Sequence, residues 1–160
     1  MPHRHTTTTV MRTLLAALCT LTAVAAVAQA APPPVAVGYV KTVTGEAWVS
    51  TAGLRSKAAP GTPIMIGSQL KTLADASLGV TFKDNTVMSF GPDTELTVDE
   101  FLYAPAQGEL RLGTSLVKGS LNYVSGVIAK LKPEAVTVKT PTGIIGVRGT
   151  QFVAKVEDAR

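Results

Sequence analysis

Histidine and cysteine are missing from most of this chain. Both histidines and the single cysteine lie within the first thirty residues, at His3, His5 and Cys19, so residues 31–160 contain neither type. Without them, this long segment cannot form a Ser-His-Asp or Cys-His catalytic group, a zinc site built from His and Cys, or a disulfide. Its acidic segments also lack the spaced carboxylates of a calcium loop. These absences predict a protein that is not an enzyme and carries no cofactor or metal.

Aromatic and charged residues are also scarce. They make up 5% and 16% of the sequence, and Trp48 is the only tryptophan. Loss of Arg4 and Arg12 with the first thirty residues would lower the net charge from +4 to +2. Proteins that bind nucleic acids usually combine aromatic residues with a strong positive charge. We therefore expect no nucleic-acid partner.

The first thirty residues are typical of a signal peptide. Basic residues precede an apolar run from Leu14 to Ala28, and Ala28-Gln29-Ala30 provides the small residues that a signal peptidase reads. We predict cleavage between Ala30 and Ala31, followed by a proline-rich linker over residues 31–37. This arrangement predicts a periplasmic or secreted protein that meets the membrane only transiently, through its leader.

Other interpretations of this segment are open. An uncleaved membrane anchor fits less well, because a spanning helix needs about 20 strongly apolar residues. A lipid anchor at Cys19 fits less well too, because the bulky Leu18 stands where that processing needs a small side chain. Translation could begin at Met1 or at Met11, since the sequence after Met11 is itself a short basic and then apolar leader.

Short strands are predicted throughout residues 38–157, which we treat as one domain. Leu78, Val80 and Phe82 alternate with small or polar residues, which is the period of a half-buried strand. Leu96 and Val98 repeat this pattern, and glycine or proline closes almost every such segment. The predicted fold class is all-β, with many short strands in a stacked sandwich, a barrel or a solenoid-like coil.

Two local exceptions interrupt the strands. Asp84-Asn85 predicts a two-residue hairpin turn, because both residue types tolerate positive backbone angles. Residues 125–131 form the only helix candidate, a single turn.

Residues 140–155, TPTGIIGVRGTQFVAK, contain three glycines at three-residue spacing: Gly143, Gly146 and Gly149. A dinucleotide-binding loop needs the spacing G-x-G-x-x-G followed by a helix. Here an alternating strand pattern follows instead. We interpret the glycines as a bend, in which Gly143 and Gly146 allow close approach to a neighbour and Gly149 takes a bulge.

Such a bend has consequences for the residues around Gly149. Val147 and Phe152 would lie on one face of the chain. Arg148 would then be able to reach a backbone carbonyl or a carboxylate. A phosphate-binding role for the loop is not expected, because no helix begins there.

These motifs resemble a known family. The hexapeptide VRGTQF (Val147, Arg148, Gly149, Thr150, Gln151 and Phe152), preceded by VKTPTG at residues 138–143, is similar to the closing signature of the FecR domain. Residues 38–50, 66–98 and 108–119 resemble the earlier parts of that domain in order. The resemblance implies an all-β fold and covers nearly all of residues 38–156, although Asn85 stands where glycine is usual.

The resemblance also implies a role outside the cytoplasm. The best-known proteins of the family that this chain resembles combine a cytoplasmic sigma-factor-binding domain, one membrane span and a periplasmic domain that receives a signal from an outer-membrane receptor. This sequence resembles the periplasmic domain alone, so direct transcriptional control is not implied. We expect an interaction or sensing module whose partner is another envelope protein.

A second functional class is an adhesive module that binds an anionic envelope polymer. Residues 84–109 contain six carboxylates and no cation, whereas residues 111–148 contain six cations and one carboxylate, Glu134. If the two segments lie apart, the resulting dipole could steer a partner. If they are neighbours in the fold, their charges neutralise each other, which we expect because surface charges ordinarily intermix.

Two further contact candidates are visible. Trp48 shares a strand face with polar residues, so it either contacts a partner from an exposed position or caps the end of the core. Open edge strands in such a fold could also pair with another copy of the chain.

Overall fold

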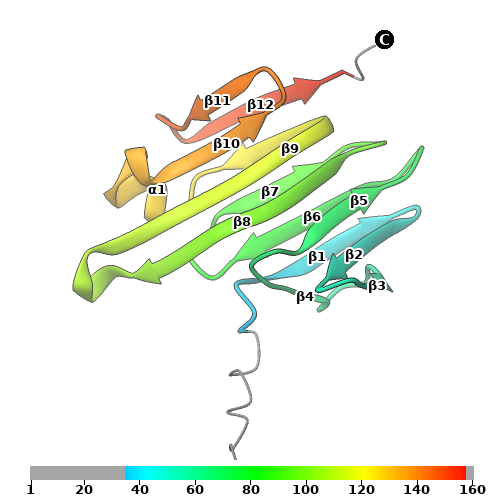
Figure 1. Ribbon diagram of the computed structural model, residues 1–160, viewed down its shortest axis with the longest axis horizontal. Helices are drawn as coiled ribbons and strands as arrows, with labels where there is room; N and C mark the ends of the chain where they lie inside the picture. The colour runs from blue at the N-terminus through cyan, green and yellow to red at the C-terminus, as the bar shows by residue number, and fades with distance from the viewer. Residues whose placement is uncertain (1–34, 158–160) are drawn as a thin grey trace, which may run out of the picture. The chain divides into compact units, whose positions relative to one another are not determined.

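The computed structural model describes residues 35–157, which form a β-rich domain (Figure 1). Within these residues the chain forms twelve strands, one short α-helix and two 3-10 turns. The strands are β1 (Gly38–Thr44), β2 (Ala47–Thr51), β3 (Leu54–Lys57), β4 (Pro63–Ile64), β5 (Gln69–Thr72), β6 (Ser77–Phe82), β7 (Val87–Phe90), β8 (Glu95–Ala104), β9 (Glu109–Val124), β10 (Val136–Thr140), β11 (Gly143–Gly146) and β12 (Gln151–Val156). The helix is α1 (Val127–Leu131), and the 3-10 turns are η1 (Pro105–Gln107) and η2 (Pro133–Ala135). The predicted all-β class is confirmed for this part of the chain.

All twelve strands belong to one sheet that curls at the long strand β9. The first half of β9 pairs with β8 and β10, and its second half pairs with β7 and β12. We call the strands β3, β2, β5, β8, the first half of β9, β10 and β11 the first layer. The second layer comprises β4, β1, β6, β7, the second half of β9 and β12. The two layers share one core, in which Phe82 and Phe101 stack with ring centroids 5.7 Å apart.

The chain crosses between the layers at corners that lie on top of one another. Backbone hydrogen bonds join successive corners, from Leu73 N to Glu46 O (3.0 Å), from Asp93 N to Leu73 O (3.3 Å) and from Gly91 N to Ser120 O (3.1 Å). We call this stack the corner column; it comprises residues 45–46, 73–76, 91–94 and 118–120. Because the paired strands have free edges at both ends of the stack, the sheet does not close into a barrel within residues 35–157.

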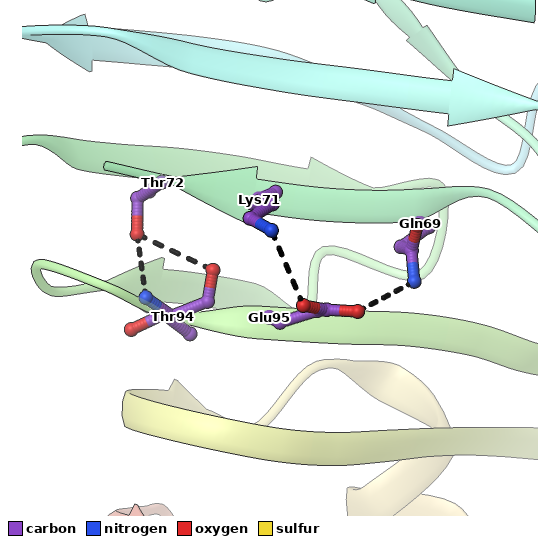
Figure 2. Close-up of polar contacts among 5 residues, drawn as sticks. All are labelled: Gln69, Lys71, Thr72, Thr94 and Glu95. Atoms are coloured by element: carbon purple, nitrogen blue, oxygen red, sulfur yellow. Dashed lines mark hydrogen bonds and ion pairs between the residues drawn. The ribbon is translucent and has the colours of Figure 1, made fainter. Parts of the chain in front are cut away.

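Two kinds of polar contact accompany the corner column (Figure 2). The buried hydroxyl of Thr72 accepts a hydrogen bond from Thr94 N (2.9 Å) and donates one to Gly91 O (2.6 Å). Nearer the surface, the Glu95 carboxylate accepts a hydrogen bond from Gln69 (2.7 Å) and lies 3.7 Å from the Lys71 ammonium. The buried contacts therefore hold adjacent corners together, whereas the half-buried ones join side chains on neighbouring strands.

The hydrophobic alternation places its residues as predicted. Leu78, Val80 and Phe82 in β6, and Leu96 and Val98 in β8, are all buried in the core. Side chains of successive strand residues point to opposite faces, so a period of two delivers one apolar face to the space between the layers. The helical turn predicted at residues 125–131 is α1.

The turn after β6 differs from the prediction. The hydrogen bond from Phe82 N to Thr86 O (2.9 Å) encloses a three-residue loop, in which Asn85 alone has a positive φ, of 65°. Asp84 does not need that geometry, since its buried carboxylate accepts hydrogen bonds from Thr86 N (3.1 Å) and Thr86 Oγ1 (2.7 Å). Its position is set by these contacts rather than by turn propensity.

The predicted boundaries meet the described residues only in part. The signal peptide, its Ala30–Ala31 cleavage site and residues 31–34 of the linker lie outside the described residues. Val37, the last residue of the predicted linker, is buried in the core and its N–H donates to Ile64 O (2.7 Å). The domain therefore includes Val37.

Candidate functional site

The strands β11 and β12 form the two free edges at one end of the stack (Figure 1). β11 pairs only with β10, and β12 pairs only with β9. Between them lies a groove of about 530 Å³, lined by residues from Thr140 to Val156. We call this the open end.

Apolar side chains form both the floor and the rims of the open end. Ile145, Phe152 and Val156 are half-buried and pack against the core. Ile144 and Val153 point away from it, with 68% and 70% of their surface exposed. The layer of core side chains thus continues to the surface at this end. Exposed apolar surface next to unpaired strand edges is typical of a binding site.

The opposite end is built differently. There the loop of residues 58–62 crosses beneath the layers and is held by hydrogen bonds from Ala58 N to Ala47 O (2.8 Å) and from Gly61 N to Val40 O (2.9 Å). The edge strand β3 presents the exposed cations Arg55 and Lys57. Charged edge strands discourage pairing with another chain. One end is therefore covered by a loop and has a charged edge strand, although a hollow of about 300 Å³ beside the exposed Leu54 lies there too. The other end is open, with two free strand edges beside a groove.

The glycines of the predicted signature fall into two groups. An added Cβ at Gly143 or Gly146 would meet nothing within 4 Å, and neither residue has a positive φ. The expectation that both allow a close approach is therefore wrong; they lie in the exposed strand β11. Gly149 has a φ of 142°, which side-chain-bearing residues rarely adopt, and it lies in the corner between β11 and β12 rather than in a bulge within a strand.

This corner is anchored by Ser125. Ser125 N donates to Thr150 O (2.8 Å), and its hydroxyl donates to Gly149 O (2.5 Å). Val147 is buried, and Phe152 stacks on Tyr123 with ring centroids 5.0 Å apart. These contacts fix where β12 begins, and therefore set the width of the open end.

Arg148 does not have the partner that we predicted. Its side chain is exposed, and none of the ion pairs or side-chain hydrogen bonds formed among residues 35–157 involves it. Its neighbour Val147 turns into the core while Arg148 turns outward, because successive residues of an extended segment face opposite sides. The guanidinium is left available at the edge of the open end.

These residues lie in a segment that matches a known protein family. Residues 68–160 match the family described as FecR protein. The chain belongs to the FecR family. The matched segment includes β5 to β12, the corner at Gly149 and the open end. No curated protein and no solved structure matches the chain.

The FecR domain buries a polar cluster behind the open end that the sequence reasoning missed. Asp84, Thr86 and Tyr123 are buried, and Asp84 also accepts a hydrogen bond from Ile128 N (3.3 Å) in α1. Burial raises the pKa of the Tyr123 hydroxyl above its ordinary 10.0, and the Asp84 charge raises it further. The sequence Asp-Asn-Thr could have signalled this cluster, since an Asp that bonds the backbone two residues later is an Asx turn.

Two ion pairs join the acidic and basic segments in the fold. Acidic β8 lies beside β9, and β10 follows on the other side of β9. Glu100 lies 3.3 Å from Arg111, and Asp99 lies 3.7 Å from Lys139. The prediction that neighbouring segments neutralise each other is confirmed for these pairs.

Trp48 lies far from the open end in the strand order, on β2. Its indole is half-buried on the outer face of the first layer, with the Arg55 guanidinium carbon 4.1 Å from the ring centroid. It neither caps the core nor stands fully exposed, because the core side of β2 is occupied by Ala47 and Val49. The structure does not bring Trp48 together with the signature residues.

Within residues 35–157, no three His, Cys, Asp or Glu side chains come together as metal ligands. Over the same residues, no helix is long and apolar enough to cross a membrane.

Proposed function

We propose that this FecR-family chain is a non-enzymatic, extracytoplasmic module that binds another envelope protein and acts in envelope signalling. The observation that carries the proposal is the open end, where two free strand edges flank half-buried apolar side chains that pack against the core. A surface of this kind suits contact with another polypeptide, which can cover the apolar floor and satisfy the strand edges.

The chemistry of the side chains supports a binding role rather than catalysis. Residues 31–160 contain no histidine or cysteine. The lining of the open end contains no carboxylate, and its cations are Arg148 and Lys155. The buried carboxylate of Asp84 is occupied by hydrogen bonds to Thr86 and Ile128, so it holds structure together. Acid–base or nucleophilic catalysis needs groups that reach a substrate.

The proposed location follows from the sequence of the leader. A signal peptide cleaved between Ala30 and Ala31 would deliver the domain to the periplasm or the medium. The amino-terminal sequence of the protein recovered from those fractions tests this step. A protein that still carries residues 1–30 would argue for an anchor instead.

The adhesive alternative loses its main support in the fold. It rested on a separation of acidic and basic segments, and these segments pair with each other through Glu100–Arg111 and Asp99–Lys139. A neutralised surface exerts little long-range attraction on an anionic polymer.

Site-specific photo-crosslinking in intact cells tests the proposal. A photoreactive amino acid at Ile144, in the open end, should capture a discrete envelope protein. Leu54, 79% exposed on the edge strand at the opposite end, is the matched control and should not capture it. Equal capture from both positions, or capture of cell-wall polymer alone, would contradict the proposal.

A further inference from the structure

The two strands at the open end differ as edges for pairing. β12 carries Lys155, which contacts Glu157 at 3.0 Å, and Gln151, which contacts Asn122 at 3.0 Å. β11 has the sequence Gly-Ile-Ile-Gly and carries no charge, proline or bulge. These are the features that natural edge strands use to prevent pairing. β11 is thus the less protected edge of the open end.

The space beside β11 is bordered by unpaired backbone groups and by apolar side chains. Backbone N–H and C=O groups of successive residues point to opposite sides of a strand. On an edge strand such as β11, the groups on one side have no partner strand. A strand added there would direct every second side chain toward the half-buried Phe152 and Val156 on the opposite side of the groove. Apolar side chains at those positions would extend the core by one more strand.

The charged side chains at the groove limit which segments can bind beside β11. Arg148 follows the end of β11, and its guanidinium has no ion-pair partner among residues 35–157. Glu134 lines the adjoining hollow together with Arg148 but forms no ion pair with it. The lining of the groove contains Arg148 and Lys155 and no carboxylate. Lys155 is paired with Glu157, so Arg148 is the groove cation that lacks an ion pair among residues 35–157. Two copies docked through this end would bring two Arg148 side chains to one interface whose groove lining has no carboxylate, which opposes self-association.

We propose that the open end binds an extended segment of a partner protein, which adds to the edge of β11 as a further strand, places alternate apolar side chains on Phe152 and Val156, and pairs an Asp or Glu with Arg148. This inference rests on the proposed function, and it names the form and charge of the segment that is recognised. Main-chain hydrogen bonds supply the affinity in this mode of recognition, and the alternate pockets and the charge supply the specificity.

A displayed library of random nine-residue peptides, selected on the purified protein, tests the form of the segment. Enriched peptides should alternate apolar and polar residues and contain at least one carboxylate. Methylation of alternate peptide nitrogens should abolish binding in one register and spare it in the other, because a strand in this position uses only every second N–H. Enrichment of sequences without carboxylates, methylation without effect, or no enrichment at all would overturn the inference.

Substitutions of Arg148 test the charge. Arg148→Ala should weaken binding of the enriched peptides about two- to fivefold, which is the range for an exposed ion pair. Arg148→Glu should weaken it about tenfold, and Arg148→Lys should restore most of the affinity. The wild-type affinity should fall with added salt, whereas that of Arg148→Ala should change little. Arg55→Glu, a charge reversal at the covered end, is the control and should bind normally.

The outcomes separate this inference from the proposed function. Equal loss with Arg55→Glu and Arg148→Glu, or no loss with either, would overturn the charge assignment. Sedimentation that shows a dimer disrupted by Ile144→Lys would assign the open end to a second copy and overturn the inference. If Ile144 still captures an envelope protein in cells while no peptide binds, the proposed function stands and the strand-addition inference fails.

Discussion

The buried hydroxyl of Thr72 offers a direct test of how the stacked corners are held together. Thr72→Val keeps the shape of the side chain and replaces the hydroxyl with a methyl group. Thr94 N, at 2.9 Å, would lose its acceptor, and Gly91 O, at 2.6 Å, would lose its donor. Both threonines are nearly inaccessible to water, with 2% and 1% of their surface exposed, so solvent cannot replace the contact that Thr94 N loses. Gly91 is half-buried, so its carbonyl loses less.

The expected cost follows from the two groups that lose a partner. Leaving the buried Thr94 N–H unsatisfied costs about 1–3 kcal/mol, and the hydrogen bond lost by Gly91 O, on a half-buried residue, is worth about 1 kcal/mol. The substitution should therefore lower the free energy of unfolding by about 2–4 kcal/mol. An unfolding entropy of about 2.1 cal/mol/K per residue over roughly 120 residues makes each kcal/mol equal to about 4 °C. The melting temperature should therefore fall by about 8–16 °C.

Urea denaturation followed by circular dichroism and by Trp48 fluorescence measures this cost. The slope of the unfolding free energy with urea should not change, because the surface exposed on unfolding is the same. Thr72→Ser keeps the hydroxyl and loses a methyl group, so it should be more stable than Thr72→Val. Lys71→Gln removes the exposed ion pair with Glu95 (3.7 Å) and should cost less than about 1 kcal/mol.

The reasoning would be refuted by a Thr72→Val protein within about 0.5 kcal/mol of the wild type, the spread of neutral surface substitutions. A Thr72→Ser protein less stable than Thr72→Val would also refute it. That order would mean that the methyl group, and not the hydroxyl, holds the corner.

Two more perturbations test other features of the domain. Gly149→Ala should lower the free energy of unfolding by about 1–3 kcal/mol, because its φ of 142° is strained for alanine. Gly143→Ala should raise it by about 0.5 kcal/mol, since its Cβ meets open space in a strand; equal urea midpoints for the two variants would contradict this difference. For Tyr123, whose pKa is raised in the fold, stability should be complete below about pH 10 and fall as pH rises above it, because the unfolded chain releases the proton first. Urea titrations between pH 8 and pH 11 should show a loss of stability relative to Tyr123→Phe, with a slope of at most about 1.4 kcal/mol per pH unit, and parallel curves for the two proteins would count against it.

The repeating strand pattern could be predicted because it is a local property of the chain. Leu78, Val80 and Phe82 occupy one face of β6 simply because side chains alternate along an extended backbone. The corner residue Gly149 was also recognised as a backbone requirement. Its neighbours Gly143 and Gly146 were misjudged, since whether a glycine faces a crowded neighbour or open solvent depends on which strands flank it.

The buried carboxylate of Asp84 could not be placed from composition. It belongs to an acidic stretch of sequence, and the prediction put it with the surface charges. The fold removes it from water by bringing Thr86 and the start of α1 against it, from positions 2 and 44 residues away along the chain. A partner as distant as Ile128 helps to decide whether the Asp84 charge is buried, and the local sequence does not reveal it.

The amino-acid sequence by itself determined the all-β class, the family resemblance, and the lack of histidine and cysteine beyond residue 30, because periodicity, motifs and composition are read along the chain. Only the tertiary structure decided that one end of the stack is covered and the other open. That difference arises where β9 changes layers and takes β10 as a partner in its first half and β12 in its second. The two last edge strands are thereby left facing each other across an apolar groove, with Arg148 beside it, and long-range pairing of this kind has no signature in the spacing of residues.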